Sequence, residues 1–326
     1  MVDSSTAVFS EPDDLGSALR DTGYSVMLAT ERGPFRARIV RLGLAHFWLT
    51  MAVERRSRIA FVSLPPGLVR IFLPSAQGSL MLSGHRAEPG ELITYGVGAS
   101  FHERLEGPCV WRDIVVSAES LLSYGHALTR TKIVLPPQLR LWRPSAEALR
   151  GLSHLHAAAT RLAEVHGGLT AGADAARGLE RQLVSALVEC LATGPIEKHI
   201  ATADRHAEVM AQFERLIGAH PERSLPPVDM SASLKVSERT LRKCGEEYLG
   251  MSPSRYLRLR RMHLVRRALR SAGTTATQIS QVASRYGFAD AGRFAVSYRA
   301  LFGESPSATR QRSTGRLTTT IRSAAR

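Results

Sequence analysis

The chain carries the hexapeptide LGMSPS at residues 249–254 and repeats it, with two changes, as FGESPS at residues 302–307. The glycine, the proline and both serines recur at an offset of 53 residues. Upstream, small and apolar positions still match, but at an offset of 52. The difference of one residue falls between the two helices expected in each copy, where a turn can accommodate it. Such internal repetition predicts one supersecondary unit that is built twice.

Each copy has the pattern of two short helices joined by a turn. In the first copy the pattern predicts helices over residues 227–234 and 238–248. In the second copy it predicts a helix over residues 277–286, a turn at Gly287 and a second helix that ends at about Leu301. The expected N-caps of the two second helices are Ser237 and Asp290.

A long helix over residues 254–271 is expected between the copies. About 18 residues at 1.5 Å each span roughly 27 Å. Two helices held at that separation can enter successive major grooves on one face of DNA, about 34 Å apart. Its apolar stripe comprises Leu257, Leu264, Val265 and Ala268, and its other side carries Arg260, Arg266, Arg267 and Arg270. Arg261 falls inside the apolar stripe. Either it pairs with a buried acid, or the stripe is narrower than these four residues indicate.

Charge is concentrated in the same region. From Pro221 onward the chain has 20 Lys and Arg against seven Asp and Glu, a balance of +13. The first 220 residues hold the remaining 23 basic and 22 acidic residues. A basic segment that is also rich in Leu, Val, Tyr and Phe is typical of a folded domain that binds a polyanion.

Four spaced motifs in this region resemble the AraC/XylS family of bacterial transcription regulators. They are LKVSERTLR at 234–242, GMSP at 250–253, RYGF at 285–288, and GRF followed by YRALFGESP within 292–306. The resemblance covers about 100 residues. It implies an all-α double helix-turn-helix domain that binds double-stranded promoter DNA.

The resemblance also implies roles for individual side chains. By position, the base contacts would come from Arg239, Arg242 and Lys243 in the first copy and from Ala291, Arg293 and Val296 in the second. Arginine can bond guanine in bidentate fashion, whereas Ala and Val can only touch thymine methyl groups. The phosphate contacts would come from Ser252, Arg260 and Arg299.

The first copy departs from the second at three places. Lys235 stands where the second copy has Gly287, Gly245 where it has Tyr298, and Ser231 where it has Ala283. A helix-interior glycine costs about 1 kcal/mol relative to alanine, and a lost aromatic contact adds to that. We therefore expect the first copy to be less stable than the second, and to order fully only on DNA.

Residues from about 20 to 140 read as short apolar runs broken by Gly and Pro, which predicts an all-β barrel or sandwich. The runs are 35–44, 47–53, 59–64, 69–73, 79–82, 91–96 and 111–116. Beyond them, helices are expected over 145–166, 173–191 and 204–219. The expected fold is α+β: a cupin-like β-barrel sensing domain (1–144), a helical linker and dimerisation region (145–200), the DNA-binding domain (201–312) and a disordered basic tail (313–326).

Catalytic, metal and cofactor sites are not expected. Cys109, Cys190 and Cys244 are too far apart for a zinc pattern or a disulfide framework. His46, His85 and His102 lack the His-x-His and Glu pattern of a cupin metal site, and His154 and His156 point to different faces of a helix. Trp48, Trp111 and Trp142 are expected in the core. Neither a signal peptide nor a run of 18 apolar residues occurs, so we expect a cytoplasmic, nucleoid-associated protein without membrane contact.

The pattern favours a sequence-specific regulator that responds to a small-molecule effector in the N-terminal barrel. The effector-binding residues are unknown. A homodimer through residues 145–191 is expected, and an activator would also contact RNA polymerase. Two alternatives stay open: a cupin-type β-barrel enzyme fused to a DNA-targeting domain, and a constitutive or architectural DNA-binding protein without ligand sensing.

Overall fold

The computed structural model describes two compact units, one formed by residues 1–27 and 35–207, the other by 28–34 and 208–326. The residues described are 3–129, 133, 135, 137–166, 173–192, 195–196, 201–222, 225–271 and 279–312. The tail expected after residue 312 and the glycine break at 167–172 lie outside them. None of the helices in the described residues is long and apolar enough to cross a bilayer.

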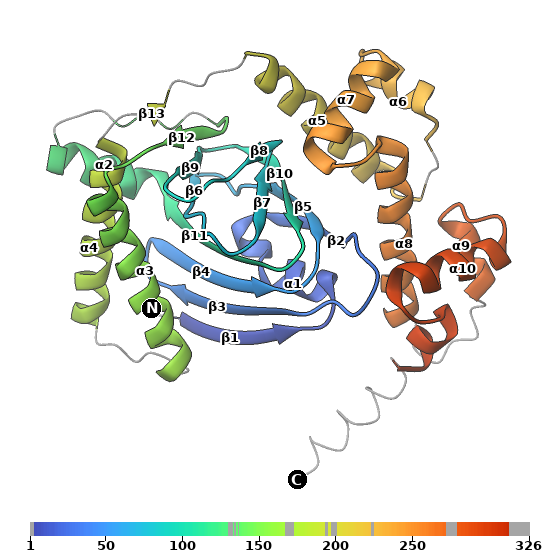
Figure 1. The fold of residues 1–326 in the computed structure, drawn as a ribbon, viewed down its shortest axis with the longest axis horizontal. Helices are drawn as coiled ribbons and strands as arrows, with labels where there is room; N and C mark the ends of the chain where they lie inside the picture. The colour runs from blue at the N-terminus through green and yellow to red at the C-terminus, as the bar shows by residue number, and fades with distance from the viewer. Residues whose placement is uncertain are drawn as a thin grey trace, which may run out of the picture. The chain divides into compact units, whose positions relative to one another are not determined.

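The first unit contains two antiparallel sheets (Figure 1). The larger sheet has the order β1-β3-β4-β11-β6-β9-β12-β13 and the smaller one β2-β5-β10-β7-β8. The larger sheet consists of β1 (Asp3–Phe9), β3 (Ala37–Gly43), β4 (Phe47–Glu54), β6 (Leu68–Phe72), β9 (Leu92–Tyr95), β11 (Cys109–Ser117), β12 (Arg140–Trp142) and β13 (Pro195–Ile196). The smaller sheet consists of β2 (Tyr24–Ala29), β5 (Arg58–Ser63), β7 (Ser79–Leu82), β8 (His85–Arg86) and β10 (Ser100–Glu106).

All seven apolar runs form strands, which confirms the β-rich N-terminal fold. The strand pairs of the described residues, however, define two separate sheets and do not close into one barrel. β10 was not predicted, because its sequence, SFHERLE, contains four charged or ionisable residues. β1 was also not predicted, because its sequence DSSTAVF has no regular apolar alternation.

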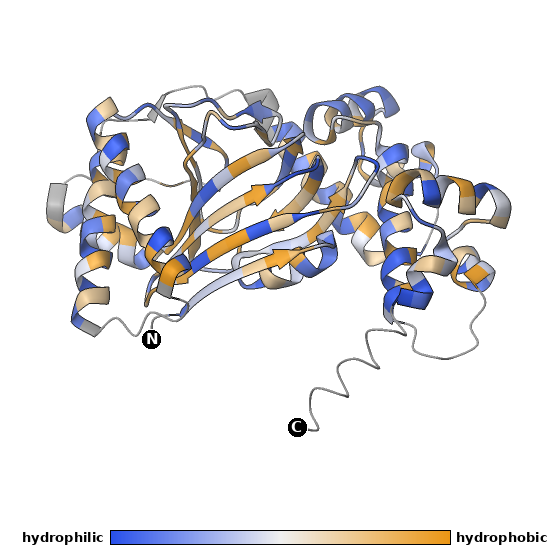
Figure 2. Ribbon diagram, turned by 60° about the horizontal axis from the view of Figure 1, so that its bottom comes forward, coloured by the Kyte–Doolittle hydropathy of each residue, from blue (hydrophilic) through white to orange (hydrophobic). Residues whose placement is uncertain are grey.

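The register of the central strands separates two faces of the larger sheet. Ile114 of β11 pairs with Ile71 of β6, and both belong to the large apolar cluster. The neighbouring pairs, Asp113 with Phe72 and Val115 with Arg70, point to the opposite face because successive side chains alternate. Figure 2 shows the resulting pattern, in which mostly hydrophobic strands carry hydrophilic interruptions.

Helices cover the apolar face of the larger sheet (Figure 1). They are α2 (Ala118–Thr129), α3 (Ala146–His166) and α4 (Ala173–Ala192), and the latter two confirm the helices expected at 145–166 and 173–191. Leu152 and Ala163 of α3 and Leu187 of α4 pack into one cluster with strand residues. The short helix α1 (Pro12–Ala18) and the 3-10 turn η1 (Arg20–Thr22) connect β1 to β2.

Charged residues of both sheets are buried and paired with one another. Arg58 is fully buried and bonds Glu54 at 2.9 Å and Glu103 at 2.5 Å, and Glu103 also accepts a bond from the Tyr24 hydroxyl. Arg70 is equally buried; its Nη2 donates to the carbonyl of Thr22 at 2.6 Å. A second ion pair joins Arg70 to Asp113 at 3.4 Å. Buried charges need such partners, because their desolvation costs several kcal/mol per ion.

The second unit is helical. Its elements are α5 (Ala201–Ala219, which begins before the unit boundary), α6 (Pro227–Ser233), α7 (Glu238–Leu249), α8 (Pro253–Ser271), α9 (Ile279–Arg285) and α10 (Ala291–Phe302). α8 runs from the α6–α7 pair to the α9–α10 pair (Figure 1). The two expected helix-turn-helix copies and the helix between them are thus present. The first two residues of the helix expected at 277–286 lie outside the described residues.

The two turns have the same backbone shape but different residues. Gly287 has a φ of +78°, and Lys235, its counterpart, has a φ of +53°. The alignment of these two positions is therefore correct, and a lysine occupies the left-handed region in the first copy. This region costs a non-glycine residue about 1–2 kcal/mol.

Gly245 does not leave the hole that the missing aromatic side chain suggested. A Cβ at this position would lie 2.7 Å from Cδ of Pro253 and 2.9 Å from the backbone oxygen of Met251. The first copy therefore brings the start of α8 close to α7 where the second copy places Tyr298. The glycine is required by this close approach, which is a packing constraint invisible in the repeat alone.

Candidate nucleic-acid interface

The second helix of each copy begins at the N-cap that the sequence predicts. Ser237 Oγ accepts a hydrogen bond from the backbone N–H of Thr240 at 3.1 Å. Asp290 Oδ1 accepts one from the backbone N–H of Arg293 at 2.9 Å. Each helix ends at a glycine in the left-handed conformation, Gly250 and Gly303. Both helices thus have defined ends, which fixes the direction in which their first turns point.

All six side chains expected at base edges are exposed. Arg239, Arg242 and Lys243 lie on one side of α7, opposite the buried Leu241 and Tyr248. On α10, the exposed residues are Ala291, Arg293 and Val296. Val296 is 72% exposed, so its methyl groups are accessible at the surface of α10.

The buried side of α10 is aromatic and continuous. Phe294 and Tyr298 lie with ring centroids 5.5 Å apart, and Tyr298 lies 4.6 Å from Phe302. Phe288 from the turn adds a ring 5.0 Å from Phe294. This cluster packs against Met262, Val265 and Leu269 of α8. It holds α10 rigidly on the helix that also carries the first copy.

The three residues expected at phosphates have different surroundings. Arg299 is exposed near the end of α10. Ser252 Oγ accepts a 3.4 Å hydrogen bond from the N–H of Arg255, so it caps α8. Arg260 is only 13% exposed and forms an ion pair with Glu214 of α5. Its guanidinium is already committed inside the unit, and the structure gives Arg260 a role in joining α5 to α8.

Glu214 is the buried centre of this junction. It is 3% exposed and accepts a 2.6 Å hydrogen bond from the hydroxyl of Tyr256. Burial and the neighbouring carboxylate raise the pKa of Tyr256 well above its usual value, so the hydroxyl stays a donor. Sequence patterns did not indicate this junction, because Glu214 and Tyr256 are far apart in the chain.

Two other arginines of α8 differ from the expected stripe. Arg266, expected on the outer side, is buried, pairs with Glu304 at 2.8 Å and lies 4.6 Å from the ring centre of Phe302. Arg261 pairs with no acid among the described residues. Its guanidinium donates to the carbonyl of Tyr286 at 3.4 Å and lies 5.5 Å from the ring centre of Phe288.

Positive charge comes mainly from α8. That helix carries seven arginines and no acid. By contrast, α7 has three basic residues and three glutamates, so its net charge is zero. Arg258 was missed by sequence reasoning; it is exposed and donates to Ser297 Oγ of α10 at 2.9 Å, which ties α8 to the second recognition helix.

Among residues that the structure describes, no group of three His, Cys, Asp or Glu side chains is placed to hold a metal ion. His156 is fully buried and His154 is exposed, so the two rings do lie on different faces of α3. Trp111 and Trp142 are buried as expected, and Trp48 is partly buried. Cys109, Cys190 and Cys244 are buried, and none of them forms a disulfide.

Two capped helices with exposed polar faces, mounted on one connecting helix, define a double helix-turn-helix regulator. A family model described as a helix-turn-helix domain matches residues 230–312. The XylDLEGF operon transcriptional activator 2 of Pseudomonas putida is 32% identical over 127 residues, which cover 39% of this chain and 79% of that protein. The chain belongs to the AraC/XylS family of transcription regulators.

Other relatives match over shorter shares of their length. A probable thc operon regulatory protein of Rhodococcus erythropolis is 35% identical over 89 residues, 27% of each chain. A solved structure of a probable AraC family regulator from Rhodopseudomonas palustris is 32% identical and covers 33% of this chain and 98% of its own, with a TM-score of 0.31. The AraC-like activator CuxR is 14% identical over 80% of this chain and 94% of its own, with a TM-score of 0.41. Because both TM-scores are below 0.5, the family assignment rests on the sequence matches.

Proposed function

We propose that the chain reads two adjacent DNA half-sites, one with α7 and one with α10, and that a small-molecule effector bound by the N-terminal unit controls this activity. The observation that carries the proposal is the connection of both recognition helices to α8. Its 19 residues span roughly 28 Å at 1.5 Å per residue. That length suits two helices in successive major grooves of one DNA face.

In this proposal the six exposed residues divide into two groups. Arg239, Arg242 and Lys243 read one groove through hydrogen bonds to base edges. Ala291, Arg293 and Val296 read the next, with Ala291 and Val296 against thymine methyl groups. Ser252 and Arg299 contact phosphates and set the register.

The regulatory part of the proposal rests on the names of the relatives. The relatives from Pseudomonas putida are named operon activators, which favours activation and contact with RNA polymerase here as well. A homodimer through residues 145–191 would place two such readers on one promoter. Effector binding would then shift the population of dimers that can reach both half-sites. No observation in the described residues favours an enzyme or an architectural protein instead.

Footprinting of the full chain on a selected promoter tests the two-reader proposal. The variants R239A/R242A and R293A should each lose protection at one half-site and retain it at the other. Each lost bidentate contact should weaken binding by about 1–3 kcal/mol. K235A is a suitable control, since its exposed side chain lies in the turn before α7. Equal loss of both half-sites in both variants would contradict the proposal.

A further inference from the structure

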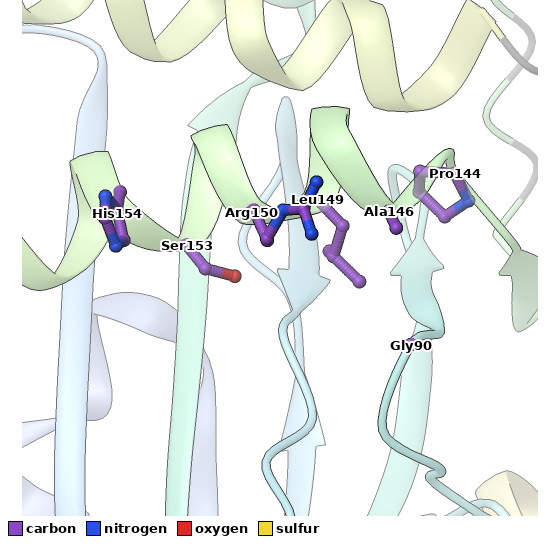
Figure 3. Close-up of a pocket in the computed structure, with 7 residues that line it drawn as sticks. All are labelled: Gly90, Pro144, Ala146, Leu149, Arg150, Ser153 and His154. Carbon is purple, nitrogen blue, oxygen red and sulfur yellow. The ribbon is translucent and has the colours of Figure 1, made fainter.

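A groove of about 380 Å³ runs along the first turns of α3 (Figure 3). Its lining comprises Gly90, Pro144, Ala146, Leu149, Arg150, Ser153 and His154. Five of these seven residues belong to α3, and their spacing of three and four residues places them along one side of the helix. Pro144 and Gly90 form the end wall, as Figure 3 shows.

The lining combines apolar side chains with side chains that donate hydrogen bonds. Pro144, Ala146 and Leu149 supply apolar surface. Arg150, Ser153 and His154 supply hydrogen-bond donors, and the lining includes no acidic residue. Among described residues, the structure pairs Arg150 with no carboxylate, so its guanidinium is available to a ligand. A groove of this kind fits a small molecule with an apolar body and one anionic group.

A buried carboxylate beside the groove, Glu91, does not compete for these donors. Glu91 lies next to Gly90 in the wall loop and is 4% exposed. It accepts bonds from His85 Nε2 at 2.9 Å and from the N–H of Glu88 at 3.1 Å, and it pairs with Arg143 at 3.6 Å. These partners lower the pKa of Glu91 against the opposing effect of burial, so the carboxylate stays ionised and engaged.

The space between the sheets is a less suitable place for a ligand. Large side chains that are less than 2% exposed occupy it, among them Trp111, Arg58, Arg70 and Phe101. A ligand in that space would have to displace paired charges whose separation leaves buried ions unpaired. The groove on α3 requires no such rearrangement.

We propose that this groove binds an amphipathic organic anion, with its anionic group on Arg150 and His154 and its apolar body on Leu149 and Pro144. The proposal rests on the effector-controlled regulation proposed above and names the place where the effector acts. α3 packs against α4, β1 and β3, so a ligand on α3 contacts the helical layer expected to pair two subunits. Binding there can bias the helices directly.

The test uses anilinonaphthalene sulfonate, a fluorescent aromatic anion, with the full chain. Wild type should bind it saturably at one site per chain. R150Q should weaken binding about tenfold, the loss expected for one charge-assisted hydrogen bond. A146W, which fills the groove while keeping Arg150 and His154, should weaken binding at least as much. R161Q is the matched control, an exposed arginine of α3 outside the groove, and should bind like wild type.

Two results would overturn the site: R150Q and A146W that bind like wild type, or R161Q that loses as much affinity as R150Q. Promoter binding measured with and without the dye separates the site from the regulation. A dye that binds through Arg150 without changing DNA affinity supports the groove and contradicts effector control through it. A change in DNA affinity that survives R150Q supports effector control and contradicts the groove.

Discussion

The turn residue Lys235 is the clearest difference between the two helix-turn-helix copies. Its φ of +53° lies in a region that suits glycine, and the equivalent Gly287 has a φ of +78°. K235G should therefore stabilise the α6–α7 pair by about 1 kcal/mol, the relief of strain less the added freedom of the unfolded chain. Amide exchange at Leu241 should slow accordingly.

The reciprocal change G287A is the matched control for Lys235. It should speed amide exchange around Phe294 by a comparable factor, because alanine then takes the left-handed conformation. In the wild-type chain, exchange should be faster around Leu241 than around Phe294. Equal protection of the two regions, or K235G without effect, would contradict the expected weakness of the first copy.

Two buried groups of the N-terminal unit give opposite pH dependences. Burial raises the pKa of Asp113 to about 6. Its contribution to stability is full below about pH 4 and is lost as the pH rises through about 6. Burial lowers the pKa of His156 to about 4. Its contribution is full above about pH 6.5 and is lost as the pH falls through about 4. Between about pH 4 and pH 6.5, the loss of stability from Asp113 and the gain from His156 nearly cancel in the wild-type chain.

The variant D113N removes the titration of Asp113, so the pH dependence of stability that comes from His156 should become measurable. Its stability should rise as the pH increases from 4 to 6.5, by roughly 3 kcal/mol, while wild type changes little. Urea unfolding followed by tryptophan fluorescence reports on this unit, because Trp48, Trp111 and Trp142 all lie in it. D174N, at an exposed aspartate, is the control. Parallel pH profiles for D113N and wild type would contradict these assignments.

At the scale of elements, the α5–α8 junction should control the stability of the helical unit. E214A leaves the guanidinium of Arg260 and the hydroxyl of Tyr256 without their shared acceptor. Such loss of one buried partner costs about 3 kcal/mol. Faster amide exchange in α8 should accompany a lower thermal midpoint by circular dichroism. E208Q, at an exposed acid of α5, should be close to neutral, and equal effects of the two variants would contradict the junction.

Elements in which apolar residues recur at a regular spacing were predictable from the sequence, and elements that bury charged residues were not. The helix-turn-helix copies follow from their spacing, because caps, turns and apolar positions agree within each short segment. β10 was missed because it buries a charged residue, Glu103. The partners that make this burial possible, Arg58 and Tyr24, lie on other strands. The same limit applies to Arg260, whose acidic partner lies 46 residues away in the chain. Local patterns carry no information about such long-range partners.

At the scale of the whole molecule, the two units differ in charge and in expected task. In the proposed function, the exposed arginines of α8 (Arg255, Arg258 and Arg267) supply an electrostatic attraction that does not depend on DNA sequence and weakens as salt is raised. In the same proposal, the exposed faces of α7 and α10 supply the sequence preference. The N-terminal unit, with its groove on α3, supplies the proposed control. The family model matches residues 230–312, within the helical unit.

Selection of binding sites from random DNA by the full chain tests the central claim most directly. The selected DNA should share two short conserved sequences, or boxes, one for each recognition helix, whose centres lie about one helical turn, roughly 10 base pairs, apart. R239A/R242A should relax one box and R293A the other. A single box, boxes without fixed spacing, or no sequence preference at all would contradict the account of two recognition helices held on one connecting helix.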